Sequence, residues 1–256
     1  MTTAKQKIKF LSPKSDCFMA DEWYQFATTD HFWMHWRFEA LTRIISKDFE
    51  WERTLEIGCG TGVLRRQIET FYNCSVIGCD LNLNALQMAV ESTSPLYFYN
   101  IHQRHEELRE NFSTIIMFDV LEHIKDPVNF LKSVSFHLNK GGKLIINVPA
   151  FHILYSSYDK VAGHLRRYNI SSLGNELHAA GFRVEDAAYW GMSLIPLLML
   201  RKFILHFFRE DKVIQVGFQP SAPWINRMLK SIMRIEYAIF PKPPAGTSLI
   251  VVATKE

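Results

Sequence analysis

The stretch TLEIGCGTG, at residues 54–62, is an apolar run that turns into a glycine-rich loop, and it decides the fold of the chain. The apolar run predicts a buried strand, and a helix is expected to begin near Val63. Gly58, Gly60 and Gly62 tolerate positive φ angles and let the backbone approach a ligand closely. A strand, a glycine turn and a helix N-terminus in this order direct free N–H groups and the helix dipole at whatever lies across the loop. The pattern therefore predicts either a nucleotide-type binding loop or a tight turn without a ligand.

The next apolar run favours the binding loop. CSVIGCD, at residues 74–80, predicts a second buried strand that ends on Asp80. In dinucleotide-binding folds an acidic side chain about twenty residues after the glycines accepts hydrogen bonds from the two ribose hydroxyls. A nicotinamide cofactor and S-adenosylmethionine both carry such a ribose, so both remain open at this point.

The residue spacing in the loop distinguishes between these two cofactors. Glu56 precedes the first glycine, which produces an E-x-G-x-G-x-G spacing. This spacing resembles motif I of the class I S-adenosylmethionine-dependent methyltransferases more than the G-x-G-x-x-G of dehydrogenases. FDVLEHIKDP, at 118–127, resembles the motif that follows the fourth strand in the ubiquinone-biosynthesis-like branch of that superfamily. The resemblance covers roughly residues 30–190 and implies S-adenosyl-L-methionine as the cofactor, but it names no acceptor.

Apolar runs and helical periods alternate along the rest of the chain and predict an α/β fold with a doubly wound, Rossmann-like parallel sheet. The resemblance implies seven strands, of which the last runs antiparallel beside the sixth. The expected strands are 54–57, 74–80, 96–100, 113–120, 143–149, 182–190 and 247–255, and the expected helices between them are 63–72, 83–91, 127–138 and 171–180.

The remaining segments predict two additions to this sheet. Residues 1–50 are expected to form an N-terminal helical cap, in which 1–20 are irregular and 21–49 form one or two amphipathic helices over the cofactor end of the sheet. Residues 51–256 are expected to form the methyltransferase domain, with a helical insertion at 191–240 before the last strand.

Composition limits the classes of protein that fit. A chain of 256 residues with 48% hydrophobic content can bury one sizeable core. The 29 Lys and Arg against 26 Asp and Glu leave a net charge of +3, which argues against a dedicated nucleic-acid binder. The four cysteines form no CxxC pair, and the N-terminus has no apolar segment of signal-peptide length. We therefore expect a reduced, cytoplasmic protein without structural zinc.

The aromatic segment DHFWMHWR, at 30–37, resembles an H-x-W-x-x-x-R segment that precedes motif I in many relatives. The resemblance implies that Arg37 pairs with the cofactor carboxylate and that the Trp33 side chain lies against the sulfonium group. The alternative is that Trp33 and Trp36 are core anchors and Arg37 a surface ion-pair partner. The full cofactor-binding set that the resemblance implies is Trp33, Arg37, Glu56, Gly58, Cys59, Gly60, Gly62, Asp80, Leu81, Asn100, Ile101, Asp119, Val120 and His123, with Asn100 and Ile101 on the adenine side.

The candidate catalytic residues lie in DKVAGHLRRYN, at 159–169. This polar stretch follows the fifth strand and is expected to overhang the carboxyl ends of the strands, where ligands bind in open α/β sheets. His164 is the candidate base because a histidine titrates near working pH. Asp159 is expected to orient His164, while Arg167 and Tyr168 are expected to orient the substrate. The segment resembles a G-H-x-x-R-Y stretch of bacterial relatives associated with polysaccharide or lipid-linked glycan pathways. The alternative is that His164 only ties the loop to a backbone carbonyl.

A metal site is a separate hypothesis. Some relatives carry E-x-x-E-H after the fourth strand and bind magnesium there. This chain has Asp119, Glu122 and His123 at those places, and His164 is a further candidate ligand. Such a group can hold a divalent ion that acidifies a hydroxyl. Because Asp119 replaces a glutamate, the favoured expectation is that no metal binds, and that Asp119 and His123 border the cofactor.

The insertion at 191–240 predicts two amphipathic helices rich in both apolar and basic residues. MSLIPLLMLRKFILHFF, at 192–208, is too short and too charged for a membrane span. Two hypotheses remain: the helices rest on an anionic lipid surface, or they pack as a lid or in a homodimer. The basic residues concerned are Arg201, Lys202, Arg209, Lys212, Arg227, Lys230 and Arg234.

We thus expect a methyltransferase that methylates an oxygen, or else a nitrogen, of a small or lipid-linked glycan acceptor, in the cytoplasm or at the membrane periphery. One alternative is a soluble natural-product or quinone-type methyltransferase. Another is a cofactor-binding subunit without turnover.

Overall fold

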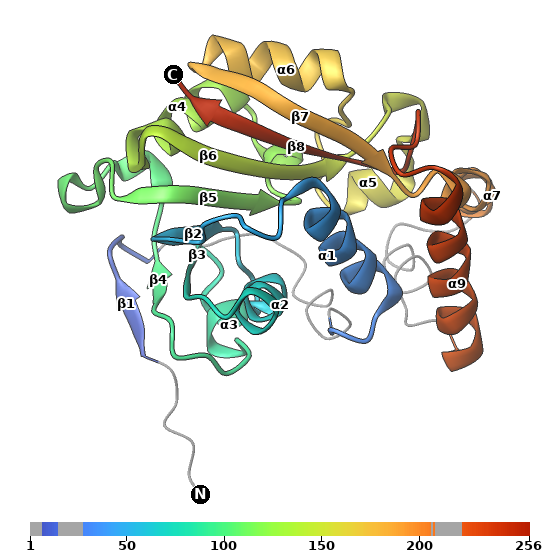
Figure 1. The fold of residues 1–256 in the computed structure, drawn as a ribbon, viewed down its shortest axis with the longest axis horizontal. Helices are drawn as coiled ribbons and strands as arrows, with labels where there is room; N and C mark the ends of the chain where they lie inside the picture. Colours follow the sequence, from blue (N-terminus) through green and yellow to red (C-terminus); the bar gives the residue numbers. More distant parts are fainter. Residues whose placement is uncertain (1–6, 15–27, 206, 208–221) are drawn as a thin grey trace, which may run out of the picture.

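A single mixed sheet of eight strands forms the centre of the computed structural model, which describes residues 7–14, 28–205, 207 and 222–256. The order across the sheet is β1-β4-β3-β2-β5-β6-β8-β7 (Figure 1). All neighbouring strands run parallel except β8, which is antiparallel to both β6 and β7. The strands are β1 (Ile8–Phe10), β2 (Thr54–Ile57), β3 (Val76–Asp80), β4 (Leu96–Phe98), β5 (Phe112–Phe118), β6 (Leu138–Pro149), β7 (Phe182–Trp190) and β8 (Ser248–Lys255).

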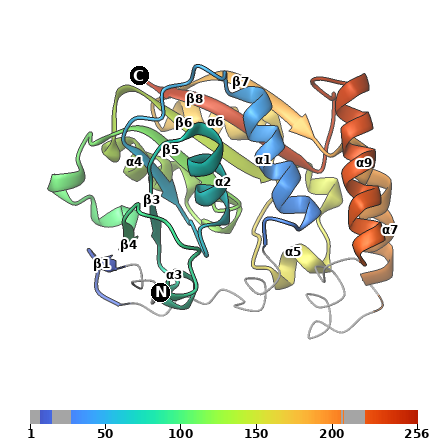
Figure 2. The same ribbon diagram turned by 60° about the horizontal axis from the view of Figure 1, so that its bottom comes forward.

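Helices cover both faces of this sheet (Figures 1 and 2). The neighbouring residues Ile115 and Ile116 of β5 are both fully buried but belong to different core clusters, because successive side chains of a strand point to opposite faces. The helices are α1 (Phe32–Ile44), α2 (Val63–Tyr72), α3 (Leu83–Gln87), α4 (Pro127–His137), α5 (Ser157–Val161), α6 (Ile170–Ala179), α7 (Ile195–Leu205) and α9 (Pro223–Ile239). Short 3₁₀ turns are η2 (Ile101–Gln103), η3 (Glu106–Leu108), η4 (Leu121–His123), η5 (His152–Leu154) and η6 (Met192–Leu194). Apolar residues of α4 and α6 pack on one face, and those of α1, α2 and α9 on the other.

The doubly wound architecture and the antiparallel last strand are confirmed, and the number of strands is corrected. The lead-in that was expected to be irregular contains β1, which pairs in parallel with β4 and makes the sheet eight-stranded. The predicted helix at 83–91 ends at Gln87, and the predicted strand at 96–100 ends at Phe98. After α3 the chain leaves the helix, and Val90 N donates to the carbonyl oxygen of Thr61 in the glycine loop; after β4, Asn100 begins the turn η2.

Within the predicted N-terminal cap, the structure describes one helix, α1, and the expected helical residues 21–27 lie outside the described part. Trp36 and Leu41 of α1 are buried in the same cluster as Ile145 of β6 and Ile250 of β8. The helix is therefore part of the main core, and the boundary at residue 50 stays a prediction.

The insertion leaves and rejoins the sheet at one place. Trp190 at the end of β7 pairs with Ser248 at the start of β8, and the whole insertion lies between them. A Cβ atom on Gly246 would lie 2.2 Å from the carbonyl oxygen of Trp190, so the two chain segments meet with no room for a side chain. α7 and α9 lie side by side beyond this junction (Figures 1 and 2).

Candidate active site

A cavity of about 800 Å³ opens at the carboxyl ends of the parallel strands. Its walls come from the glycine loop, the ends of β3 and β5, the start of α1, the segment around His164 and the insertion helices α7 and α9. This volume lies within the range of small-molecule and cofactor sites. Every residue of the predicted cofactor-binding set lines the cavity except Gly62, which begins α2 beside it.

The glycine loop adopts the backbone conformation that its sequence predicts. Gly58, Gly60 and Gly62 have φ angles of 70°, 53° and 74°. The N–H groups of Gly58 and Cys59 both donate to the carbonyl oxygen of Cys79, at 2.8 and 3.1 Å, and so tie the loop to β3. A Cβ atom on Gly58 would lie 2.4 Å from Val120 Cγ2, so glycine is needed there for the loop to lie against the end of β5.

Asp80 closes the other side of this loop. Its Oδ2 accepts a hydrogen bond from Gly60 N at 2.7 Å, and its Oδ1 accepts one from Asn82 N at 2.8 Å. Burial raises the pKa of the Asp80 carboxyl, and the two backbone hydrogen bonds oppose this rise. Each carboxylate oxygen has a second lone pair. The group can therefore hold the loop and accept ribose hydroxyls at the same time.

Replacing Asp80 by alanine is expected to weaken the binding of S-adenosylhomocysteine by about 1–3 kcal/mol, since hydrogen bonds to a charged acceptor are lost. Isothermal titration calorimetry measures this. Asp186, a half-buried aspartate of β7 that pairs with Lys242 and does not line the cavity, supplies the matched alanine control. An unaltered affinity of the Asp80→Ala variant would contradict the ribose assignment.

A series of hydrogen bonds ties α1 to β6, β7 and the residue that follows β5. Arg37 Nη1 donates to Asp119 Oδ2 at 2.9 Å, Asn147 Nδ2 donates to Asp119 Oδ1 at 2.9 Å, and Trp190 Nε1 donates to Asn147 Oδ1 at 2.8 Å. Asp119 has a φ of 57°, an uncommon value for a residue other than glycine. The Trp33 ring packs against the Trp190 ring, with centroids 4.6 Å apart.

These hydrogen bonds decide only in part between the two interpretations of the aromatic segment at 30–37. Arg37 is buried and faces the cavity, so the alternative of a surface ion pair is wrong. Its Nε is buried and has no hydrogen-bond partner in the part of the chain that the structure describes, and a cofactor carboxylate would supply one. Trp33 lines the cavity, whereas Trp36 is a core residue whose ring stacks on Tyr237.

Glu56 lies beneath the glycine loop, fully enclosed by protein. Burial raises its pKa to about 8, although the charges of Arg37 and Arg65 act in the opposite direction. Its Oε2 is buried without a hydrogen-bond partner among the described residues. The carboxyl thus reaches the cavity with an acceptor that a polar cofactor group can use.

The segment over the cavity positions His164 through a buried acid, as predicted. His164 Nδ1 lies 2.8 Å from Asp159 Oδ1, and Arg167 Nε donates to the same oxygen at 2.8 Å. Burial by itself would raise the pKa of Asp159, but the hydrogen bonds from His164 and Arg167 prevail and lower it to about 2. Asp159 is therefore ionised at neutral pH and holds the imidazole with Nε2 turned away from it, toward Glu122.

Tyr168, predicted to orient the substrate, does not reach the site. Its side chain is 2% exposed and belongs to the core cluster that contains Leu173 and Leu177 of α6. Its backbone N–H donates to the carbonyl oxygen of Pro149, which turns the side chain under the sheet end. We therefore remove Tyr168 from the candidate catalytic set.

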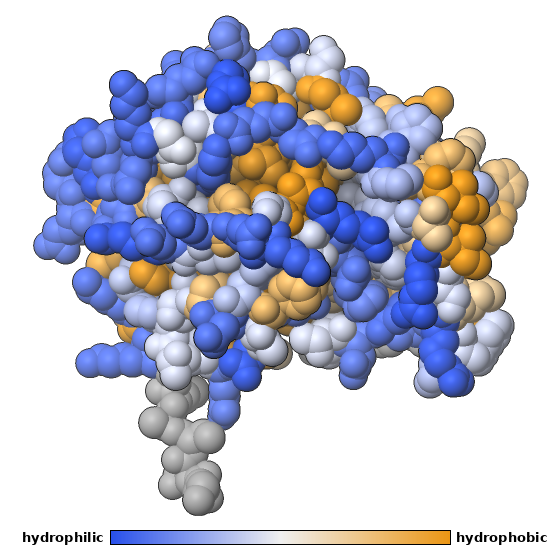
Figure 3. All heavy atoms as spheres, viewed as in Figure 1, coloured by the Kyte–Doolittle hydropathy of each residue, from blue (hydrophilic) through white to orange (hydrophobic). Residues whose placement is uncertain are grey.

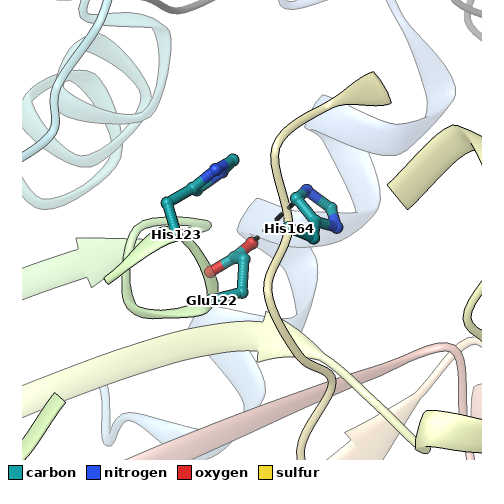
Figure 4. A group of neighbouring side chains, drawn as sticks. All are labelled: Glu122, His123 and His164. Carbon is teal, nitrogen blue, oxygen red and sulfur yellow. Dashed lines mark ion pairs between the residues drawn. The ribbon is translucent and has the colours of Figure 1, made fainter. Parts of the chain in front are cut away.

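Glu122, His123 and His164 come close enough together for a metal ion (Figure 4). One ligand atom from each lies within 4.8 Å of the others, and His164 Nε2 is 3.9 Å from Glu122 Oε1. Burial raises the pKa of Glu122, whose two carboxyl oxygens have no hydrogen-bond partner among the described residues. Burial also lowers the pKa of His123 to about 4, so its imidazole is neutral at pH 7. The metal hypothesis is corrected in one respect: Asp119 is held by Arg37 and Asn147 and is not part of the group.

With this geometry in view, we compared the chain with known proteins. A family model described as a methyltransferase domain matches residues 26–187. The chain belongs to the S-adenosylmethionine-dependent methyltransferases. S-adenosyl-L-methionine is accordingly its cofactor, and the glycine loop, Asp80 and the buried Nε of Arg37 fit that molecule.

Similar proteins within this methyltransferase family differ in their reported reactions. A probable S-adenosylmethionine-dependent methyltransferase of Mycolicibacterium smegmatis is 25% identical over 205 residues, which are 75% of this chain and 74% of that protein. A ubiquinone biosynthesis O-methyltransferase of Aliivibrio fischeri is 24% identical over 131 residues, 49% of this chain and 50% of that enzyme. The structure of phosphoethanolamine N-methyltransferase 2 of Haemonchus contortus superposes with a TM-score of 0.55 at 18% identity, covering 86% of this chain and 52% of that one. The chain thus spans only about half the length of the last two enzymes.

Some residues that line the methyltransferase cavity were missed in the sequence. Tyr158 and Arg201 stand beside His164, and Leu194, Leu197 and Leu229 form an apolar wall. Leucines at helical spacing in 191–240 were visible, but the pattern alone does not tell an inward-facing from an outward-facing stripe. That distinction depends on how α7 and α9 pack.

Proposed function

We propose that this methyltransferase methylates a hydroxyl oxygen of a small or lipid-linked glycan acceptor, with His164 as the base. The observation that carries the proposal is the contact between Asp159 and His164 Nδ1 in a residue that lines the cavity, because this contact leaves Nε2, 3.9 Å from Glu122 Oε1, as the ring nitrogen that can take a proton. A nitrogen nucleophile with a free lone pair needs no such base, whereas a hydroxyl gains from one.

S-adenosylmethionine supplies a methyl group on a sulfonium. The residues of the protein align the acceptor with this group and accept the proton of the acceptor hydroxyl. The acceptor hydroxyl must lie in line with the carbon–sulfur bond, and alignment provides most of the rate enhancement. As the oxygen–carbon bond forms, the hydroxyl proton passes to His164 Nε2. The Asp159 carboxylate then stabilises the resulting imidazolium, and the electrons of the broken bond remain on sulfur.

The test supplies the protein with methyl-labelled S-adenosylmethionine and a lipid and small-molecule extract. Mass spectrometry then locates the label. A labelled methyl ether supports the proposal, and label found only on nitrogen would contradict it. Binding of cofactor without any labelled product would favour the subunit without turnover.

We further propose that α7 and α9 rest on an anionic lipid surface, which would bring a lipid-linked acceptor to the cavity. Large apolar side chains on both helices are well exposed, and Figure 3 shows hydrophobic residues gathered where these helices lie. They are Met199, Leu200, Phe203 and Ile204 on α7, and Trp224, Met228, Ile235 and Ile239 on α9.

The charges beside this apolar surface favour lipid over a second copy of the chain. α9 carries Arg227, Lys230 and Arg234 along one edge, and its one acidic residue, Glu236, is buried. An edge with basic and no exposed acidic residues attracts anionic lipid headgroups. It would repel the same edge of a second copy of the protein. Two of the basic residues in the original hypothesis, Arg209 and Lys212, lie outside the described residues. In the described part of the chain, no helix is long and apolar enough to span a bilayer.

The protein is expected to sediment with phosphatidylglycerol vesicles and not with phosphatidylcholine vesicles. Reversing two charges, in Arg227→Glu with Arg234→Glu, should lower the partition coefficient at least about tenfold, since each basic residue near the surface contributes about 1 kcal/mol. The exposed pair Arg66 and Lys132, on α2 and α4, supplies a control with the same change in net charge. Equal sedimentation of the two double variants, or a dimer that buries these helices, would contradict lipid contact.

A further inference from the structure

A guanidinium without a carboxylate partner stands in the wall of the cavity. Arg201 belongs to α7 and lines the cavity beside Tyr158, whose ring centroid lies 4.0 Å from the Arg201 Cζ atom. Its Nε and Nη2 are buried and have no hydrogen-bond partner among the described residues. The sequence hypothesis placed Arg201 among the lipid-facing basic residues, and the structure corrects this: the side chain turns inward.

The other two arginines of the cavity are neutralised. Arg37 pairs with Asp119 at 2.9 Å, and Arg167 pairs with Asp159 at 2.8 Å. Within residues 28–205 and 222–256, no carboxylate lies within ion-pair distance of Arg201. Asp159 already receives hydrogen bonds from both His164 and Arg167. The charge of Asp159 acts on Arg201, but the hydrogen bonds that this carboxylate accepts come from His164, Arg167 and Ser156.

This arrangement costs free energy in the empty protein. Burial lowers the pKa of Arg201, but a guanidinium retains its proton under all ordinary conditions, so a charge stays in the cavity wall. The face of the Tyr158 ring offsets only part of the lost hydration. A buried charge with free donors is strongly stabilised by an anion that can take a bidentate pair of hydrogen bonds.

The position of Arg201 connects such an anion with the acceptor rather than with the cofactor. Tyr158 links the two groups, since its ring centroid lies 6.5 Å from that of His164. The positively charged group therefore stands on the same side of the cavity as the candidate base. Arg37, in contrast, pairs with Asp119 after β5, and its charge acts on Glu56 beneath the glycine loop.

We propose that Arg201 binds an anionic group of the methyl acceptor, a carboxylate or a phosphate, close to the hydroxyl that receives the methyl group. This inference rests on the proposed function, because it takes the space beside His164 as the acceptor site. It narrows the acceptor to molecules that carry a negative charge near the reacting hydroxyl.

Calorimetry on the full chain saturated with S-adenosylhomocysteine tests the inference with three probes: phenyl phosphate, benzoate and the uncharged benzamide. At least one of the two anions is expected to bind about tenfold or more tightly than benzamide, the size of effect expected of a hydrogen bond to a charged group. The stronger of the two anions identifies the anionic class. The variant Arg201→Gln should lose this preference, while binding S-adenosylhomocysteine as the parent does.

The neighbouring Lys202 supplies the control, because its Nζ donates to the carbonyl oxygen of Ile153 outside the cavity. Lys202→Gln is expected to keep the preference for anions. Failure of all three probes to bind the loaded protein, an unchanged preference in Arg201→Gln, or a weaker affinity of that variant for S-adenosylhomocysteine would each overturn the inference. The last result would assign Arg201 to the cofactor carboxylate. The calorimetric measurement requires no turnover. A negative result therefore counts against the anion site alone, whereas the labelling experiment tests the proposed methyl transfer.

Discussion

Turnover of the His164→Ala variant, measured with the acceptor that the labelling experiment identifies, is expected to fall at least about a hundredfold. The affinity for S-adenosylhomocysteine should be unchanged, because His164 stands on the acceptor side of the cavity. The loss is expected in kcat, since the imidazole removes the proton only as the new bond forms. A loss under about tenfold would contradict the role of His164 as the base.

Two controls separate a base from the other roles that the geometry permits. Asp159→Asn keeps the size of the side chain but removes the charge that stabilises the imidazolium, so it should also lower kcat. If His164 holds a metal with Glu122 and His123, chelation should remove the activity of the parent protein, and added magnesium should restore it. If activity survives exhaustive chelation, the metal role is excluded and proton transfer remains as the role of His164.

The second large effect concerns stability. Glu236 of α9 is buried, and its carboxyl accepts hydrogen bonds from the backbone N–H groups of Gly191, Met192 and Ser193, at 3.0, 3.0 and 2.6 Å. The hydroxyl of Ser193 donates to it as well. Glu236→Ala would leave these donors unpaired at the start of the insertion. We expect the free energy of unfolding to fall by about 3–5 kcal/mol, as when one partner of a buried charged network is removed.

Denaturant unfolding followed by circular dichroism measures this loss. Glu107, an exposed glutamate of η3, supplies the matched control, and Glu107→Ala should change the free energy of unfolding by less than about 0.5 kcal/mol. A loss below about 1 kcal/mol for Glu236→Ala would show that water replaces the carboxylate at the turn.

The sheet was predictable because most of its strands are buried on both faces and therefore appear in the sequence as continuous apolar runs. STIIMF and KLIINV in the centre of the sheet are of this kind, and both were located correctly. β1 has only three residues, and two of them are exposed, so no apolar run marks it. Its pairing with β4 is a contact between distant parts of the chain, which local periodicity does not report.

That most of the candidate cofactor residues line one cavity was predictable for a related reason. They lie at fixed distances after the strands, and parallel strands bring their carboxyl ends to one edge. The acceptor side lacks this regularity. Tyr168 and His164 stand in the same polar stretch, yet one side chain enters the core and the other faces the cavity. Arg201 was assigned to the wrong face of its helix, because only the packing of α7 against α5 tells which face is inward.

The close contact between Trp190 and Gly246 brings the two ends of the insertion to one place, although Leu229, Met233 and Tyr237 of α9 also belong to the main core. Since Trp190 and Ser248 already pair across β7 and β8, a two-residue type I′ turn such as Asn-Gly can join the strands as a tight hairpin. The shorter connection would lower the entropy cost of loop closure and leave the strand register unchanged. The glycine loop and Asp80 would remain in place, whereas the apolar wall of the cavity would be absent. The insertion thus contributes one wall of the cavity from a single junction, and grafting a different segment between the same two strands would test whether this wall governs the choice of acceptor.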